Sequence, residues 1–326
     1  MTSVSEADVI ERAVGTHWDP VLAGVRADAL DCLQSTLAII ADDAYGPGAH
    51  LALGSRWRFP VRGPDGVIGV QPSVAERMAQ ASEVLGLQVS QPEGPLDPLD
   101  LRRLASTAPV YVVGESYDLQ WLPYARAATR YQNMPHSFLL EKAPSGYLVV
   151  DAYRTDTEWG RARPTAWALS AAGLDRAIGS PALALRVTAG PALPTADRAA
   201  AMTANAVRAQ AAAPDIDAYA DGVRAALEQP EGIERLVLDI WVLCRERLLH
   251  TAWLGGHPAA GAVGAAVQKW QELAGHSYLA MRRARRGALP AVTLAEDVAR
   301  LLHSDAALMV RLAGASAPAQ RGGKLT

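Results

Sequence analysis

The chain has few cysteines, few lysines and no long apolar run, and each shortage excludes a class of protein. Its 326 residues include only two cysteines, Cys32 and Cys244. This is too few for a disulfide-stapled secreted scaffold or for a four-thiolate zinc site. No stretch approaches the roughly eighteen apolar residues of a membrane-spanning helix. We therefore expect a globular protein with no metal site and no membrane association.

Excess charge is also missing. The formal net charge is −3 and the pI is near 6.2, so the composition favours neither nucleic acid nor an anionic membrane as a partner. Basic residues are almost all arginine, because lysine occurs only at positions 142, 269 and 324. The first residues, MTSVSEADVIERAV, lack the basic and apolar segments of a signal peptide. These features predict a cytoplasmic location.

The residue composition and the hydrophobic periodicity of the sequence change near residue 190. Before it, short Val-, Leu- and Tyr-rich segments alternate with helical patterns and Gly/Pro turns, whereas residues 195–213, 233–250 and 262–286 are helical in pattern. We therefore expect an α+β domain over residues 1–190 and an all-α domain over residues 191–326. Cys244 falls in an apolar helical stripe and is expected to be buried core. The apolar helices could also form a homodimer face.

Two elements of the first domain carry candidate chemistry. A helix is expected from Asp31, a good N-cap, to Gly46, which ends it. Strands are expected at 109–114, 137–142, 146–153 and 183–188, with a tight turn over 143–146 that makes the middle two a hairpin. A capping box over Ser73 and Glu76 predicts a further helix to Gly86.

Cys32 stands at the start of the first of these helices. Unpaired N–H groups and the helix dipole at that position stabilise a thiolate, so a lowered pKa is expected for the cysteine. Its backbone N–H could also bind an oxyanion formed on an attacked carbonyl. A lone cysteine in an intracellular protein is more often a small buried hydrophobe, so position alone does not establish catalysis.

His136 and Asp151 strengthen the catalytic reading of Cys32. His136 directly precedes one strand of the hairpin and Asp151 lies in the other, so both are expected near the same end of adjacent strands. A carboxylate there can orient the imidazole and stabilise its protonated form. The three residues together predict a nucleophile, a base and an orienting group.

These residues carry a resemblance to a known family. The segment DCLQSTLAIIADDAYG, followed by LALGSRWRF, resembles the opening of the butirosin-biosynthesis acyltransferases. The hairpin HSFLLEKAPSGYLVVDAY is similar to the His/Asp hairpin of that family and of the bacteriocin-leader peptidases, which share a papain-like fold. The specific resemblance covers residues 28–155. It implies a papain-like catalytic domain followed by a helical domain.

The resemblance also implies a reaction. A cysteine in that family takes an acyl group from a carrier-protein phosphopantetheine thioester and passes it to an amine. Cys32 is then the nucleophile, His136 the base and Asp151 its orienting partner. The protein needs no cofactor of its own, because an acyl or peptidyl carrier protein brings the phosphopantetheine arm. The acceptor is a small-molecule amine.

The sequence departs from the papain pattern at the second oxyanion donor. Papain relatives usually carry a glutamine a few residues before the cysteine, and the stretch GVRADALD has none. Gln34, after the cysteine, is the candidate replacement. Ser116 and Tyr117, in the loop after the strand at 109–114, are candidates for the substrate channel.

Two other functions use the same residues. A thioesterase or peptidase would employ the triad with water as the acceptor. A leader peptidase normally accompanies a transporter. Because no membrane segment is expected in this chain, the peptidase function is disfavoured. The third reading is a catalytically silent module that binds a carrier protein or a peptide.

Overall fold

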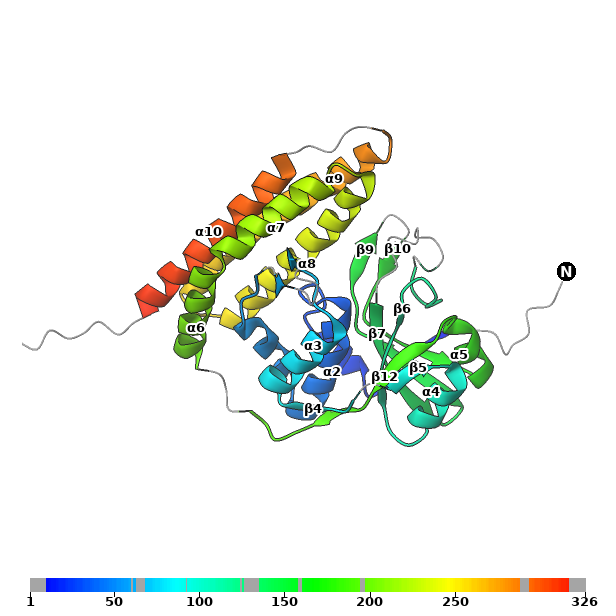
Figure 1. The fold of residues 1–326 in the computed structure, drawn as a ribbon. Coiled ribbons are helices and arrows are strands. Elements are labelled where there is room, and N and C mark those ends of the chain that lie inside the picture. The colour runs from blue at the N-terminus through cyan, green and yellow to red at the C-terminus, as the bar shows by residue number, and fades with distance from the viewer. Residues whose placement is uncertain are drawn as a thin grey trace, which may run out of the picture. The chain divides into compact units, whose positions relative to one another are not determined.

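A computed structural model describes residues 10–59, 61–62, 68–91, 93–123, 125, 135–157, 160–193, 197–287 and 293–316. The chain forms two compact units. The amino-terminal unit comprises Met1–Leu53 and Pro72–Leu193, and the helical unit comprises Gly54–Gln71 and Pro194–Thr326. Figure 1 shows the sheet and helices of the first unit and the long helices of the second.

An antiparallel sheet of seven strands is the frame of the amino-terminal unit. Its order is β1-β11-β8-β7-β6-β12-β5, and every neighbouring pair runs antiparallel. The strands in that order are β1 (Glu11–Ala13), β11 (Thr165–Leu169), β8 (Gly146–Asp151), β7 (Pro135–Ala143), β6 (Val110–Glu115), β12 (Ala182–Leu185) and β5 (Glu93–Leu96). The central strands β6 and β8 are almost wholly buried, as are residues 136–140 of β7, which matches their runs of Val, Leu and Tyr.

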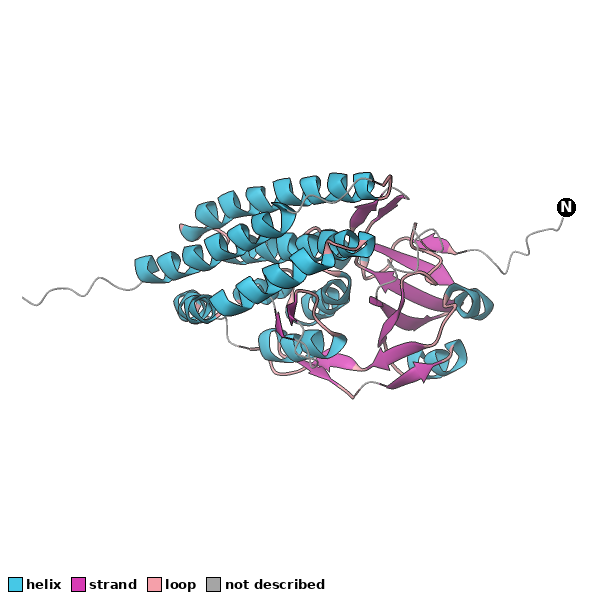
Figure 2. Ribbon diagram, turned by 45° about the horizontal axis from the view of Figure 1, so that its top comes forward, coloured by secondary structure: helices cyan, strands magenta, loops and turns pink. Residues whose placement is uncertain are grey.

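Helices cover both faces of this sheet. Helix α2 (Cys32–Tyr45) packs against β7 and β8, and the short α1 (Asp19–Gly24) packs against α2 and β11. Helices α4 (Pro98–Ala105) and α5 (Ala171–Ala177) lie on the other side of the sheet. Both helices are labelled in Figure 1, and the sheet is magenta in Figure 2. One face of the sheet is therefore covered by α2, the helix that begins at Cys32.

The local predictions that depended on caps and turns are confirmed. Helix α2 begins at Cys32 behind Asp31 and ends at Gly46, whose φ of 98° favours glycine. The hairpin of β7 and β8 turns over Pro144 and Ser145, with Ala143 opposite Gly146. The capping box at Ser73 begins α3 (Val74–Gln80), which continues as a π-helical turn, η3 (Ala81–Leu85).

The strand expected at 183–188 is divided in two. Strand β12 pairs with β6 and β5, whereas β13 (Val187–Ala189) leaves the sheet and pairs with β4 (Leu87–Val89). Arg186 stands at the break, and its guanidinium donates hydrogen bonds to backbone oxygens of Leu104, Ala108 and Pro109. A further antiparallel pair, β9 (Thr155–Thr157) and β10 (Gly160–Ala162), follows β8.

Long helices build the second unit around an apolar core that contains Trp270, Leu243 and Ile240. They are α6 (Arg198–Ala211), α7 (Ala213–Ala226), α8 (Pro230–Leu254), α9 (Ala259–Ala284) and α10 (Thr293–Ser316). Cys244 lies in this core with 8% of its surface exposed, as its apolar stripe predicted. Burial raises its pKa to about 11. Among the described helices, none is long and apolar enough to cross a membrane.

The domain boundary differs from the sequence-based one. It falls between residues 193 and 194, close to the expected 190, but Gly54–Gln71 also belongs to the helical unit. This segment contains the end of the 3-10 helix η2 (Ala49–Ser55) and the strands β2 (Val61–Arg62) and β3 (Ile68–Gly69). Trp57 and Phe59 pack in the helical core, and the Trp57 N–H donates to the side chain of Asn205. A Gly/Pro-rich stretch without periodicity gave no sign of this packing.

Candidate active site

The first turn of α2 holds Cys32 in a fixed position. The carboxylate of Asp31 accepts hydrogen bonds from the backbone N–H groups of Leu33 (2.9 Å) and Gln34 (2.7 Å). The cap bonds go to Leu33 and Gln34, and the Cys32 N–H acts to lower the pKa of its own thiol. The nucleophile candidate therefore stands at the helix start that the sequence predicted, with its own N–H beside the thiol.

The amide of Gln34 completes the helix cap. Its oxygen accepts a hydrogen bond from the Asp31 N–H at 3.3 Å, and its nitrogen donates to the amide oxygen of Gln80 at 3.3 Å. Only 2% of Gln34 is exposed. The structure therefore assigns Gln34 to a capping box, not to the second oxyanion donor that the sequence suggested, because position N3 of a helix turns its side chain back to the N-cap.

His136 and Asp151 form a buried pair at one end of the β7–β8 hairpin. His136 Nε2 lies 2.8 Å from Asp151 Oδ2, and the two side chains are 2% and 5% exposed. Because a carboxylate only accepts hydrogen bonds, Nε2 carries the proton and Nδ1 keeps the lone pair. The pairing that the sequence predicted is present, and it leaves Nδ1 as the basic nitrogen.

Two further groups, missed from the sequence, hold the Asp151 carboxylate. Trp121 Nε1 donates to Oδ2 at 2.9 Å, and the backbone N–H of Tyr153 donates to Oδ1 at 2.9 Å. The ring of Tyr153 meets His136 edge-on, with centroids 5.1 Å apart. An aspartate bonded to the N–H two residues later is a common turn, so Tyr153 could have been foreseen. Trp121 carried no such signal.

The thiol of Cys32 lies beside the backbone that leads into His136. Its Sγ donates a hydrogen bond to the carbonyl oxygen of Pro135 at 3.1 Å. Ser137 Oγ, on the other side of His136, lies 2.6 Å from the Cys32 carbonyl oxygen and donates to it. Tyr111, on β6, donates from its hydroxyl to the Leu33 carbonyl at 3.0 Å. These bonds tie the first turn of α2 to the sheet and place Cys32 beside the backbone on either side of His136.

The acidity of the thiol differs from the sequence expectation. Removal of water from the half-buried Cys32 raises its pKa, and the negative charges of Asp31 and Asp151 raise it further. The Cys32 N–H and Arg77 act in the opposite direction but more weakly. Helix position alone predicted a lowered pKa. Burial and the two carboxylates therefore disfavour the thiolate form of Cys32, and they outweigh the helix start.

Arg77 forms an ion pair with Asp31, the carboxylate next to Cys32 in sequence. Its guanidinium donates to Asp31 Oδ2 from Nε at 2.9 Å and also from Nη2, and to Gln80 at 2.7 Å from Nη1. The two ion-paired side chains are 1% and 7% exposed. This buried network supports the helix cap from α3 and was not foreseen, because only the fold brings α3 to Asp31.

The candidate channel residues follow β6. Gly114 pairs with His136 in the sheet, so the turn that begins at Glu115 lies at the same end as the histidine. Ser116 is buried in that turn, and Tyr117 is 37% exposed. The structure thus brings both residues to the end of the sheet where His136 lies.

Within the described ranges, no group of three or more His, Cys, Asp or Glu side chains is placed to hold a metal ion. The arrangement at Cys32 is suited to attack on a carbonyl carbon by sulfur, with proton transfer through an imidazole. Comparison with known proteins adds no family assignment, because no family model and no curated protein sequence matches the chain.

Proposed function

We propose that the protein is a cysteine-dependent acyltransferase with a papain-like catalytic unit, which moves an acyl group from a carrier-protein or pantetheine thioester to an amine. The observation that carries the proposal is the placement of the Cys32 thiol on the carbonyl of Pro135, directly before a histidine that Asp151 holds through Nε2. The resemblance of residues 28–155 to butirosin-type acyltransferases supports the choice of substrate.

The first half of the reaction forms an acyl-cysteine. His136 Nδ1 accepts the Cys32 proton as the sulfur attacks the thioester carbonyl, and the Cys32 N–H binds the oxyanion. Collapse of the tetrahedral intermediate breaks the bond to the pantetheine sulfur. That sulfur leaves with the proton from His136. Asp151 stabilises the imidazolium that exists between the two proton transfers.

The second half transfers the acyl group. The amine attacks the acyl-cysteine carbonyl, His136 accepts a proton from the amine nitrogen, and the bond to Cys32 sulfur breaks. The thiol regains its proton from His136, so the products are an amide and the starting enzyme. A neutral resting thiol suits this cycle, because the leaving sulfur is reprotonated at the end of each turnover.

Product analysis tests the proposal and separates it from hydrolysis. Acyl-pantetheine thioesters are incubated with the protein, with and without a panel of small primary amines, and the products are separated by mass. The transferase predicts an amide that depends on both Cys32 and the amine. Free acid formed at the same rate with and without every amine would indicate a thioesterase. Neither product, with an unreactive Cys32, would favour a binding module.

A further inference from the structure

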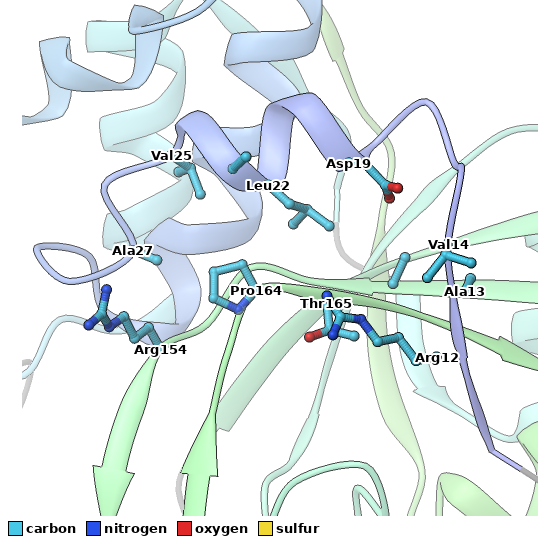
Figure 3. Close-up of a pocket in the computed structure, with 12 residues that line it drawn as sticks. Arg12, Ala13, Val14, Asp19, Leu22, Val25, Ala27, Arg154, Pro164 and Thr165 are labelled. Carbon is cyan, nitrogen blue, oxygen red and sulfur yellow. The ribbon is translucent and has the colours of Figure 1, made fainter.

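The amino-terminal unit carries a pocket of about 380 Å³ beside α1 and β11, and its charged groups are already engaged (Figure 3). The Thr16 hydroxyl, which donates to Asp19 at 2.7 Å, and the charge of Arg12 both lower the pKa of the Asp19 carboxyl. Arg154, in the same lining, has a partner of its own. The charges of this pocket therefore point to no ligand.

A pocket of about 250 Å³ in the helical unit is different, and it lies where α7 and α8 face each other. Its lining residues recur at helical spacing, at positions 219, 222, 223 and 226 of α7 and at positions 232, 235, 236 and 239 of α8. This spacing places each set on one face of its helix. At Gly222 a Cβ would meet no atom within 4 Å, so the missing side chain leaves room there.

Asp239 brings a buried carboxylate to this pocket. Only 3% of the residue is exposed, and its oxygens accept hydrogen bonds from the Tyr219 hydroxyl at 2.7 Å and the Gln71 amide at 3.2 Å. Within the described ranges, no basic side chain forms an ion pair with it. Burial raises the pKa of Asp239, and the two hydrogen bonds and the positive charge of Arg235 offset only part of this rise. Two of its four lone-pair sites remain for a further donor.

Arg235 brings an exposed guanidinium to the same lining, one helical turn before Asp239. The guanidinium turns toward β3, where its Nη2 lies 3.7 Å from the place of a Cβ on Gly69. In the described part of the chain Arg235 forms neither a hydrogen bond nor an ion pair, and its charge acts on Asp239 without contact. The Cβ atoms of residues four apart on a helix are about 5–6 Å from each other. The pocket thus presents a cation and a carboxylate at short range, each with free hydrogen-bonding capacity.

We propose that this pocket binds a free α-amino acid with an apolar side chain. The ammonium group donates to Asp239, the carboxylate accepts from Arg235, and the side chain packs against apolar lining that includes Val223 and Leu236. A plain amine would be repelled by Arg235 and a plain carboxylate by Asp239, whereas a zwitterion complements both. An α-amino acid carries its two charges on one carbon, which suits lining residues a single turn apart. The site belongs to the helical unit and does not rest on the proposed function.

Calorimetry on the full chain with matched probes tests the assignment. The probes are L-leucine, isoamylamine, which is leucine without its carboxylate, and isocaproate, which is leucine without its amino group. Each truncated probe should bind about tenfold or more weakly than L-leucine, because it loses one charge-assisted hydrogen bond. Asp239→Asn should remove the advantage of L-leucine over isocaproate. Arg235→Gln should remove its advantage over isoamylamine.

A glycine pair separates the pocket from general effects on the helices. Gly222→Leu fills the hollow without changing either charge and should abolish binding. Gly261→Leu, at an exposed glycine of α9 with open space around it, is the matched control and should leave binding unchanged. Circular dichroism and the melting temperature check that each variant is folded.

Three results would overturn the proposal: no binding of L-leucine up to millimolar concentrations, equal binding of L-leucine and either truncated probe, or L-leucine binding that survives Gly222→Leu in a folded protein. The outcome is separable from that of the transferase, because acylation of Cys32 does not enter the measurement. Binding of L-leucine to a protein that never forms an acyl-cysteine would leave the pocket assignment intact.

Discussion

The ion pair of Asp31 and Arg77 offers a sharp test of how the protein sets the reactivity of Cys32. The pair is buried, with side chains 7% and 1% exposed, and Asp31 also caps the helix. Asparagine caps a helix as well as aspartate does, so Asp31→Asn keeps the cap and removes the charge. It leaves the Arg77 guanidinium buried without its carboxylate. The free energy of unfolding should fall by about 3–5 kcal/mol.

Removing the charges of both Asp31 and Arg77 should lower the free energy of unfolding far less than removing either charge alone. Arg77→Met alone strands the Asp31 carboxylate and should destabilise by a similar amount, whereas the double variant has neither charge to desolvate. The coupling free energy from the double-mutant cycle should therefore be about 2 kcal/mol or more. The exposed pair of Arg26 and Asp28, with side chains 44% and 40% exposed, gives a matched cycle. Its coupling should not exceed about 1 kcal/mol.

The same variants report on the thiol. Asp31 raises the pKa of Cys32 and Arg77 lowers it, with Asp31 the stronger influence. In a Cys244→Ala background, alkylation of Cys32 by iodoacetamide at fixed pH should become about tenfold faster in Asp31→Asn, because one nearby negative charge is gone. It should slow in Arg77→Met. An alkylation rate unchanged by Asp31→Asn in a folded protein would refute the electrostatic account of the nucleophile.

Three further predictions concern other contacts. Trp121→Phe removes a donor to the buried Asp151 and should destabilise the protein by about 1–3 kcal/mol in chemical denaturation while slowing Cys32 acylation; unchanged acylation would show that this bond does not orient the base. Burial lowers the pKa of His250 from 6.5 to about 4. Between pH 6.5 and pH 4, His250 is therefore protonated in the unfolded chain but neutral in the folded protein. Stability should then fall by about 3 kcal/mol as the pH drops from 6.5 to 4, and His250→Gln should lose that part of the pH slope in urea unfolding. Gly54→Ala would place a Cβ 2.4 Å from the Leu249 carbonyl oxygen and should lower the melting temperature by several degrees, whereas Gly264→Ala, with open space around it, should not; equal effects would contradict the packing.

Local signals in the sequence were enough for the elements that carry the site. Asp31 marks the start of α2, and the Pro144–Ser145 turn fixes the hairpin that brings His136 and Asp151 to the same end of the sheet. Caps and turns involve residues close in sequence, so their physics can be read without the fold. The expectation that His136 and Asp151 lie near the same end of the hairpin followed from the two strands and the turn between them.

Three contacts that the sequence did not predict join residues far apart in the chain. Trp121 reaches Asp151 from a loop, and Arg77 reaches Asp31 from another helix. Trp57 joins the helical core from within a Gly/Pro-rich stretch that has no periodic pattern. The direction of the Cys32 pKa was wrong for a related reason. The helix start favours a thiolate, but burial and the negative charge of the very residue that caps the helix outweigh it.

Intact-protein mass spectrometry tests the central claim most directly. Wild type and Cys32→Ala are each mixed with simple acyl-pantetheine thioesters, and Cys244 remains in both as an internal control thiol. A nucleophilic Cys32 predicts one added acyl group on the wild type and none on Cys32→Ala. An equal adduct on both proteins, or no adduct on a wild type whose Cys32 also resists alkylation, would contradict the assignment of Cys32 as the nucleophile.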